Sequence, residues 1–186
     1  MKLKRVLLVD NYDSFTYNLS HLIEALDVLV DVVRNDEIQF NELEKYTHVV
    51  ISPGPGLPEE AGEIMNLLNH LDSKVPMLGV CLGMQAMALH LGGQLYNQDD
   101  VKHGVEVTVH SSGGKLFNLT PSEFKVGLYH SWAVTEGQGD FVVTAFGPKE
   151  VVMGLENAER KMYGVQFHPE SIMTPEGKNI LKSFLD

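Results

Sequence analysis

Short apolar runs alternate with amphipathic segments along the first half of the chain. Four runs predict buried strands, at residues 6–10, 29–33, 47–52 and 75–80. Between them, apolar residues recur every three or four positions in segments 15–26, 63–71 and 84–91, which is typical of helices. A continuous apolar run indicates a strand that is covered on both faces. The alternation therefore predicts a parallel sheet with helices on both sides.

The second half of the chain has a different pattern. From residue 95 to 146, short alternating runs are separated by turn-forming segments, which predicts antiparallel strands. Residues 151–156 and 163–167 are interpreted as the last strands, and Pro175 and Glu176 open a final helix. The predicted fold class is thus α/β, an open, mostly parallel twisted sheet plus a small antiparallel sheet. The length suits one domain, and we expect residues 1–186 to form it.

Two polar segments follow predicted strands. In the first, Asp13 or Ser14 is placed to cap the helix that follows. The second, residues 52–58, contains three prolines and two glycines, which predicts a stiff loop that is neither helix nor strand. This loop leaves the carboxyl end of a predicted central strand, where open α/β sheets bind their ligands. It lacks the Gly-Lys-Ser/Thr ending of a phosphate loop.

Acidic side chains outnumber basic ones in this chain. There are 25 Asp and Glu against 14 Lys and Arg, a formal net charge of −11. This balance argues against a nucleic-acid partner, because phosphates are bound by clustered Lys and Arg. The single cysteine cannot form an internal disulfide, and no stretch approaches the roughly 20 apolar residues that span a bilayer. We therefore expect a cytoplasmic protein that binds neither nucleic acid nor membrane.

The segment Gly79-Val80-Cys81-Leu82-Gly83 carries the first candidate for catalysis. Cys81 lies on the turn between a predicted strand and a predicted helix, and small flanking residues let the chain turn sharply and expose the sulfur. This is the layout of the nucleophile elbow in hydrolases, with sulfur in place of oxygen. Unpaired N–H groups in the first turn of the helix favour a reactive thiolate, and the Leu82 amide is the first expected oxyanion donor. The alternative is that Cys81 is a small core residue.

A nucleophilic thiol needs a base, and the chain contains eight histidines. His168 ends a predicted strand, at the same sheet edge as Cys81, and is followed by Pro169 and Glu170. In an extended chain His168 and Glu170 project to the same side, so Glu170 can fix the tautomer of the imidazole ring. The alternative is an ordinary surface His beside a surface Glu. No Cys or His pair has the spacing of metal ligands, so no metal site is predicted.

Together these motifs resemble those of the class I glutamine amidotransferases, the glutaminases with a Cys-His-Glu triad. The matching segments are Pro53-Gly54-Pro55-Gly56, Gly79-Val80-Cys81-Leu82-Gly83-Met84-Gln85 and Phe167-His168-Pro169-Glu170-Ser171. Segments 10–19 and 129–132 are similar to those of the small subunits of anthranilate synthase and 4-amino-4-deoxychorismate synthase. The resemblance implies a flavodoxin-like sheet.

The resemblance also implies a mechanism. Cys81 attacks the side-chain amide of glutamine, His168 passes the thiol proton to the leaving ammonia, and Glu170 orients His168. Water then cleaves the glutamyl thioester. The residues implied to bind glutamine and its oxyanion are Gly54, Pro55, Gly56, Leu82, Gln85, Ser131 and Trp132. No cofactor is expected in this chain, and Mg²⁺ is expected on its partner.

The partner that the resemblance implies is a separate, larger chorismate-using subunit, because ammonia released into water is wasted. Residues 12–17 and the loops around Cys81 and His103 are the expected docking surfaces.

Two positions depart from the family pattern. Trp132 stands where a smaller aliphatic residue is expected, and catalysis tolerates this change if the contacts at that position are made by the main chain. Leu128 stands where Arg is common, which bears on contacts with the partner.

The sequence leaves several alternatives open. The anthranilate (tryptophan) and aminodeoxychorismate (folate) pathways use the same glutaminase chemistry, one chain can serve both, and anthranilate is the commoner assignment. A stand-alone hydrolase of glutamine or γ-glutamyl amides uses the same triad without a partner. A catalytically inactive regulatory binder can also be built on this scaffold. The assembly size is not fixed by the sequence.

Overall fold

The computed structural model describes residues 3–186, without the side chains of residues 100 and 102, and this part contains one nine-stranded sheet. The strands are β1 (Arg5–Asp10), β2 (Leu29–Arg34), β3 (His48–Ile51), β4 (Met77–Val80), β5 (Leu95–Ser111), β6 (Glu123–Val134), β7 (Val142–Phe146), β8 (Val152–Asn157) and β9 (Met162–Val165). Their order is β2-β1-β3-β4-β9-β8-β7-β5-β6. The first five strands in this spatial order, β2 to β9, run parallel, as in a flavodoxin-like sheet. The other four, β8, β7, β5 and β6, pair antiparallel with their neighbours.

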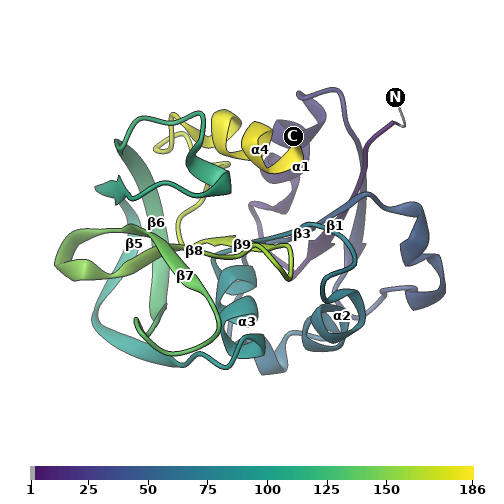
Figure 1. Ribbon diagram of the computed structural model, residues 1–186, viewed down its shortest axis with the longest axis horizontal. Helices are drawn as coiled ribbons and strands as arrows, with labels where there is room; N and C mark the ends of the chain where they lie inside the picture. The colour runs from purple at the N-terminus through teal and green to yellow at the C-terminus, as the bar shows by residue number, and fades with distance from the viewer. Residues whose placement is uncertain (1–2) are drawn as a thin grey trace.

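Helices cover both faces of the parallel half, as predicted. Figure 1 shows α1 (Thr16–Glu24) and α4 (Gly177–Leu185) on one side of the sheet, and α2 (Ile64–Leu71) and α3 (Leu82–His90) on the other. The short 3-10 helices are η1 (Phe40–Lys45), η2 (Pro58–Glu60), η3 (Lys115–Phe117) and η4 (Pro148–Glu150). Within residues 3–186, no helix is long and apolar enough to cross a membrane.

Strand β1 explains why the apolar runs are continuous. Its side chains alternate between two cores: Val6 and Leu8 pack with α1 and α4, whereas Leu7 and Val9 pack with α2 and α3. All four are at most 1% exposed. A strand between two helical layers needs apolar residues at every position, which confirms the interpretation of residues 6–10.

Three local predictions differ from the structure. The antiparallel strands do not form a sheet of their own, because β8 pairs with β9 and so extends the parallel sheet. Neither Asp13 nor Ser14 is the N-cap of α1. That position is Phe15, whose N–H donates to the Asp13 carboxylate at 2.8 Å, just before the helix. Strand β9 ends at Val165, two residues earlier than expected.

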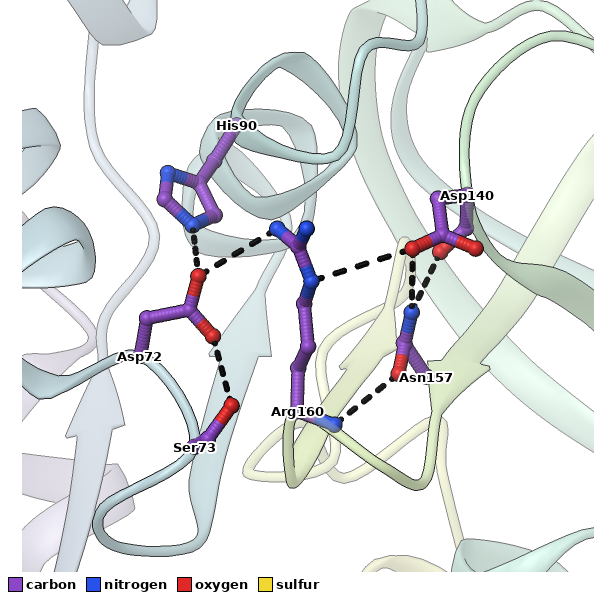
Figure 2. A network of polar contacts seen from close by, with 6 residues as sticks. All are labelled: Asp72, Ser73, His90, Asp140, Asn157 and Arg160. Carbon is purple, nitrogen blue, oxygen red and sulfur yellow. Dashed lines mark hydrogen bonds and ion pairs between the residues drawn. The ribbon is translucent and has the colours of Figure 1, made fainter.

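A polar network ties together the ends of four segments near the beginning of β4 and β9 (Figure 2). Asp72, which follows α2, accepts hydrogen bonds from His90 of α3 at 3.1 Å and from Arg160 at 3.2 Å. Arg160 also lies 3.7 Å from Asp140, whose carboxylate and backbone carbonyl accept from Asn157. The network thus fixes the β8-β9 turn against the helices, at the end of β4 and β9 that is opposite to Cys81.

We expect Asp72→Asn to lower the free energy of unfolding at pH 7 by about 1–2 kcal/mol, because charge-assisted hydrogen bonds are stronger than neutral ones. Burial raises the pKa of Asp72, but hydrogen bonds from His90 and Ser73 and the charge of Arg160 outweigh this and hold the pKa below its ordinary value. Because the pKa of Asp72 is lowered, the ionised carboxylate stabilises the fold at pH values above the ordinary Asp pKa. This contribution is lost as the pH falls through the lowered pKa.

Urea unfolding of both proteins between neutral and strongly acid pH measures this effect. The difference between Asp72→Asn and the parent protein should shrink in acid, while the exposed Asp99→Asn should match the parent throughout. A difference that stays constant into acid contradicts the assignment of the effect to the Asp72 charge.

Candidate active site

Cys81 lies between the end of β4 and the start of α3, so the predicted strand-turn-helix geometry is confirmed. Its backbone has φ 53° and ψ −103°, which is strained for a residue other than glycine. Two hydrogen bonds hold this conformation: the Cys81 N–H donates to the Val165 carbonyl at 2.8 Å, and the Gln85 N–H donates to the Cys81 carbonyl at 3.1 Å. The strain is therefore placed on the nucleophile itself.

The two flanking glycines serve close packing rather than the turn. A Cβ atom on Gly79 would lie 2.4 Å from the Gly83 backbone, and one on Gly83 would lie 2.4 Å from the Ile51 carbonyl oxygen. Neither has the positive φ that Cys81 has. They let the first turn of α3 lie directly against β3 and β4. The expected exposure of the sulfur is also corrected, because Cys81 is only 6% exposed and lines a cavity.

His168 and Glu170 form a buried pair, with Nδ1 of the ring 2.6 Å from Oε1 of the carboxylate. Contrary to expectation, the chain does not stay extended from His168 to Glu170. The Ser171 N–H donates to the His168 carbonyl at 3.1 Å, which closes a β-turn. Pro169 occupies the second position of that turn, which its fixed φ suits. The turn, rather than strand alternation, brings the two side chains together.

The charge state of His168 follows from its neighbours. Burial favours the neutral ring, but Cys81 and Glu170 raise the pKa of His168 to about 10. Because Glu170 occupies Nδ1, proton exchange with the sulfur falls to Nε2, which is buried. At neutral pH the geometry favours an imidazolium that can protonate a leaving group.

A cavity of about 230 Å³ opens next to the sulfur. It is lined by Gly54, Pro55, Gly56, Cys81, Gln85, Tyr129, His130, Ser131 and Trp132. Six of the seven residues implied for substrate binding are in this lining. The seventh, Leu82, packs its side chain into the core, which leaves its backbone N–H for the oxyanion role. Tyr129 and His130 were missed as site residues, although they adjoin Ser131 and Trp132 on β6.

The two departures from the family pattern have different outcomes. The Trp132 carbonyl accepts hydrogen bonds from Gln85 at 3.0 Å and from Nδ1 of His130 at 2.8 Å, so Trp132 acts in this cavity wall through its main chain. Leu128 is 1% exposed and belongs to the core beside α4. The side chain of Leu128 does not reach the surface, and the expectation that this departure from Arg bears on partner contacts stays a prediction.

Aromatic rings connect the first loop to the triad. The Tyr129 ring centroid lies 5.1 Å from that of Phe15, 4.8 Å from His168 and 5.6 Å from His103. Phe15 itself lies 5.4 Å from His168. The segment 12–17 is thus packed directly against the catalytic candidate His168. Among residues 3–186, no group of three or more His, Cys, Asp or Glu side chains could hold a metal ion.

Known proteins share this chain's sequence and fold. Anthranilate synthase component 2 of Thermus thermophilus is 41% identical over 100% of this chain and 93% of its own length. Aminodeoxychorismate synthase component 2 of Escherichia coli is 39% identical over 97% of this chain and 98% of its own. The bifunctional protein TrpGD of Thermotoga maritima is 43% identical over 99% of this chain, which spans only 32% of that longer protein.

Two further comparisons agree with these relatives. A glutamine amidotransferase structure from Thermotoga maritima covers 100% of this chain and 97% of its own, with TM-score 0.81 at 19% identity, which shows the shared fold. Residues 7–186 match the family model for class I glutamine amidotransferases. The chain therefore belongs to the class I glutamine amidotransferase family.

Proposed function

We propose that this chain is the glutaminase subunit of anthranilate synthase, and that it passes ammonia to a separate chorismate-using subunit. The observation that carries the proposal is the buried His168–Glu170 pair acting on the strained Cys81, whose sulfur lines a cavity suited to a small substrate. The relatives that this chain spans almost completely are named as component 2 of a synthase, which supports a role as a subunit.

The chemistry runs through two bond exchanges at Cys81. The sulfur attacks the side-chain carbon of glutamine, and the His168 imidazolium protonates the nitrogen, so the C–N bond breaks and ammonia leaves. Neutral His168 then takes a proton from water, whose oxygen attacks the thioester and releases glutamate with the thiolate. Backbone N–H groups of Leu82 and Gly56 stabilise each oxyanion, and one such donor contributes about 2.7–4 kcal/mol in other enzymes.

The other implied residues complete the substrate site in this proposal. Gln85 and the main chain of Ser131 and Trp132 hold the glutamine backbone, while the loop of Gly54 to Gly56 lines the opposite wall. This chain needs no cofactor for the reaction, and the Mg²⁺ belongs to the partner's chorismate chemistry. We treat residues 1–186 as one glutamine amidotransferase domain located in the cytoplasm.

One reconstitution separates the candidate pathways. The purified chain is mixed with each chorismate-using subunit, chorismate, Mg²⁺ and glutamine as the sole nitrogen source, with the lyase added in the aminodeoxychorismate arm. Anthranilate from the first arm alone supports the proposal, and product in both arms makes this a shared subunit. Failure in both arms, while free ammonia still supports synthesis, points to the stand-alone hydrolase instead.

The docking surface gives a separate prediction. Tyr17 is 61% exposed on α1, and Ile172 is 98% exposed two residues after Glu170. A new charge at an apolar hot spot costs about tenfold or more in affinity, so Tyr17→Asp or Ile172→Asp should weaken partner binding. Val142→Asp is the control, because Val142 is 65% exposed but pairs with Glu156, away from the Cys81 end of β9. Titration calorimetry with the partner measures this, and unchanged affinity in both variants argues against this surface.

A further inference from the structure

Gln166 is a buried polar residue to which the mechanism above gives no task. It follows directly after β9, and β9 lies parallel to β4 with Val165 opposite Val80. The next residues along the two strands are therefore Gln166 and Cys81. Gln166 is 0% exposed, and its backbone N–H donates to the Met153 carbonyl at 3.0 Å. A fully buried side-chain amide at the end of a strand requires hydrogen-bond partners of its own.

Those partners form a series of hydrogen bonds that ends at the nucleophile. Nε2 of Gln85 lies 3.0 Å from the Trp132 carbonyl oxygen and 3.2 Å from Oε1 of Gln166. Nε2 of Gln166 lies 3.4 Å from the Cys81 sulfur. This series leads from the Trp132 carbonyl in the cavity wall, through the side-chain amides of Gln85 and Gln166, to Sγ of Cys81.

The backbone carbonyl determines which way both amides face. A carbonyl oxygen only accepts, so the NH₂ group of Gln85 must face Trp132. The same NH₂ group then faces Gln166, which must present its oxygen to it. The NH₂ group of Gln166 is thereby directed at the sulfur. The reversed orientation of Gln166 would place two donors together and an amide oxygen against Sγ.

We propose that Gln166 is a positioning residue for the nucleophile, whose amide N–H donates to the Cys81 thiolate and is held in that orientation by Gln85 and the Trp132 carbonyl. This inference rests on the proposed function only for the role of Cys81 as nucleophile. A thiolate is a hydrogen-bond acceptor, and a donor that faces it stabilises the reactive form. Because the amide is neutral, it does this without competing with His168 for the proton.

The rate of alkylation by iodoacetamide tests this directly, because Cys81 is the chain's single cysteine. Gln166→Met keeps the length of the side chain and removes the donor. Loss of a hydrogen bond to a charged group changes the equilibrium between thiol and thiolate by about tenfold, which corresponds to about one pH unit. The pH of half-maximal alkylation should therefore rise by about one unit in this variant. Gln138→Met, at an exposed position, should leave the profile unchanged. A merely structural role would lower thermal stability without moving this midpoint.

Two further variants keep the test decisive if Gln166→Met does not fold. Gln85→Met leaves Gln166 free to reverse its amide and should shift the midpoint in the same direction by a smaller amount. Gln166→Glu places a carboxylate beside the sulfur and should shift it further than Gln166→Met. Unchanged midpoints in the folded variants overturn the proposal for Gln166. If a reactive glutamine analogue fails to label Cys81 in the parent protein, the proposed function fails instead.

Discussion

Cys81→Ala should reduce glutamine-dependent product formation by a factor of about 10⁴ or more, since removing the nucleophile of a catalytic triad has effects of this size. The alanine lacks the sulfur that forms the thioester, and within residues 3–186 no second cysteine exists to replace it. The residue is small and buried, so the cavity and the contacts of α3 should survive. Steady-state assays of the reconstituted complex, with glutamine as the nitrogen source, measure the loss.

Free ammonia is the internal control for Cys81→Ala. The partner's reaction with ammonia should proceed at the parent rate, because the variant removes ammonia production and leaves the fold intact. Glutamine-dependent activity within tenfold of the parent's would show that Cys81 is not the nucleophile. Equal loss of ammonia-dependent activity would show that the variant acts through assembly instead.

Glu170→Gln should lower the same rate by a factor of roughly 10²–10⁴, as when the carboxylate of a comparable triad is neutralised. Glu170 is buried and touches Nδ1 of His168 at 2.6 Å. Glutamine keeps the shape of the side chain but supplies no charge to stabilise the imidazolium. Its NH₂ group also allows a ring tautomer with the proton on Nε2, which cannot accept the thiol proton.

The pH dependence gives Glu170→Gln a distinctive signature. Glu170 and Cys81 together raise the pKa of His168 to about 10 against the effect of burial, so loss of the Glu170 charge lowers that pKa. The basic limb of the pH–rate profile should therefore move to lower pH. Because the pKa of His168 is raised, the protonated ring stabilises the fold fully at pH values below the ordinary histidine pKa of about 6.5. This contribution is lost as the pH rises through about 10.

The variant should accordingly lose stability relative to the parent at pH 6 and approach it above pH 10. Asn179→Asp, an exposed change on α4, is the control for a general effect of charge. An unmoved basic limb in Glu170→Gln would mean that the carboxylate does not set the protonation of His168.

The nucleophile elbow could be predicted from sequence because its determinants are local. A buried strand, a Cys between two close glycines and a largely buried helix are adjacent in the chain, and each leaves a local sequence signal. The strain at Cys81 was not visible in the same way. Hydrogen bonds to Val165 and from Gln85 hold this conformation, and the missing Cβ atoms of Gly79 and Gly83 let α3 pack closely against β3 and β4, and neither feature follows from local sequence.

The geometry at His168 shows where local rules give two answers. A proline favours extended backbone in the residue before it and also suits the second position of a turn, so the sequence leaves both an extended and a turned path open for residues 169 and 170. The hydrogen bond from Ser171 to His168 favours the turn, and it cannot be inferred from spacing. The pairing of His168 with Glu170 was still predicted, because either backbone brings residues two apart to one side.

Other features depended on contacts that are distant in sequence. Alternation located the antiparallel strands but not their neighbours, so the join of β8 to β9 was missed. Two signals were available and unused. Gln166 is the one side-chain amide in the run from Tyr163 to Phe167, which marks a buried polar group. Leu128 follows Phe124 and Val126 in the period-two pattern of buried residues on β6.

The covalent intermediate tests the central claim most directly. The complex is mixed with glutamine, quenched in acid within the first turnovers, digested and analysed by mass spectrometry. We predict a peptide carrying one glutamyl group on Cys81, present in the parent protein and absent in Cys81→Ala. His168→Asn should enrich it because this change slows thioester hydrolysis more than thioester formation. An active complex that accumulates no adduct in either cysteine-containing protein, or that carries the glutamyl group on another residue, would contradict catalysis through a Cys81 thioester.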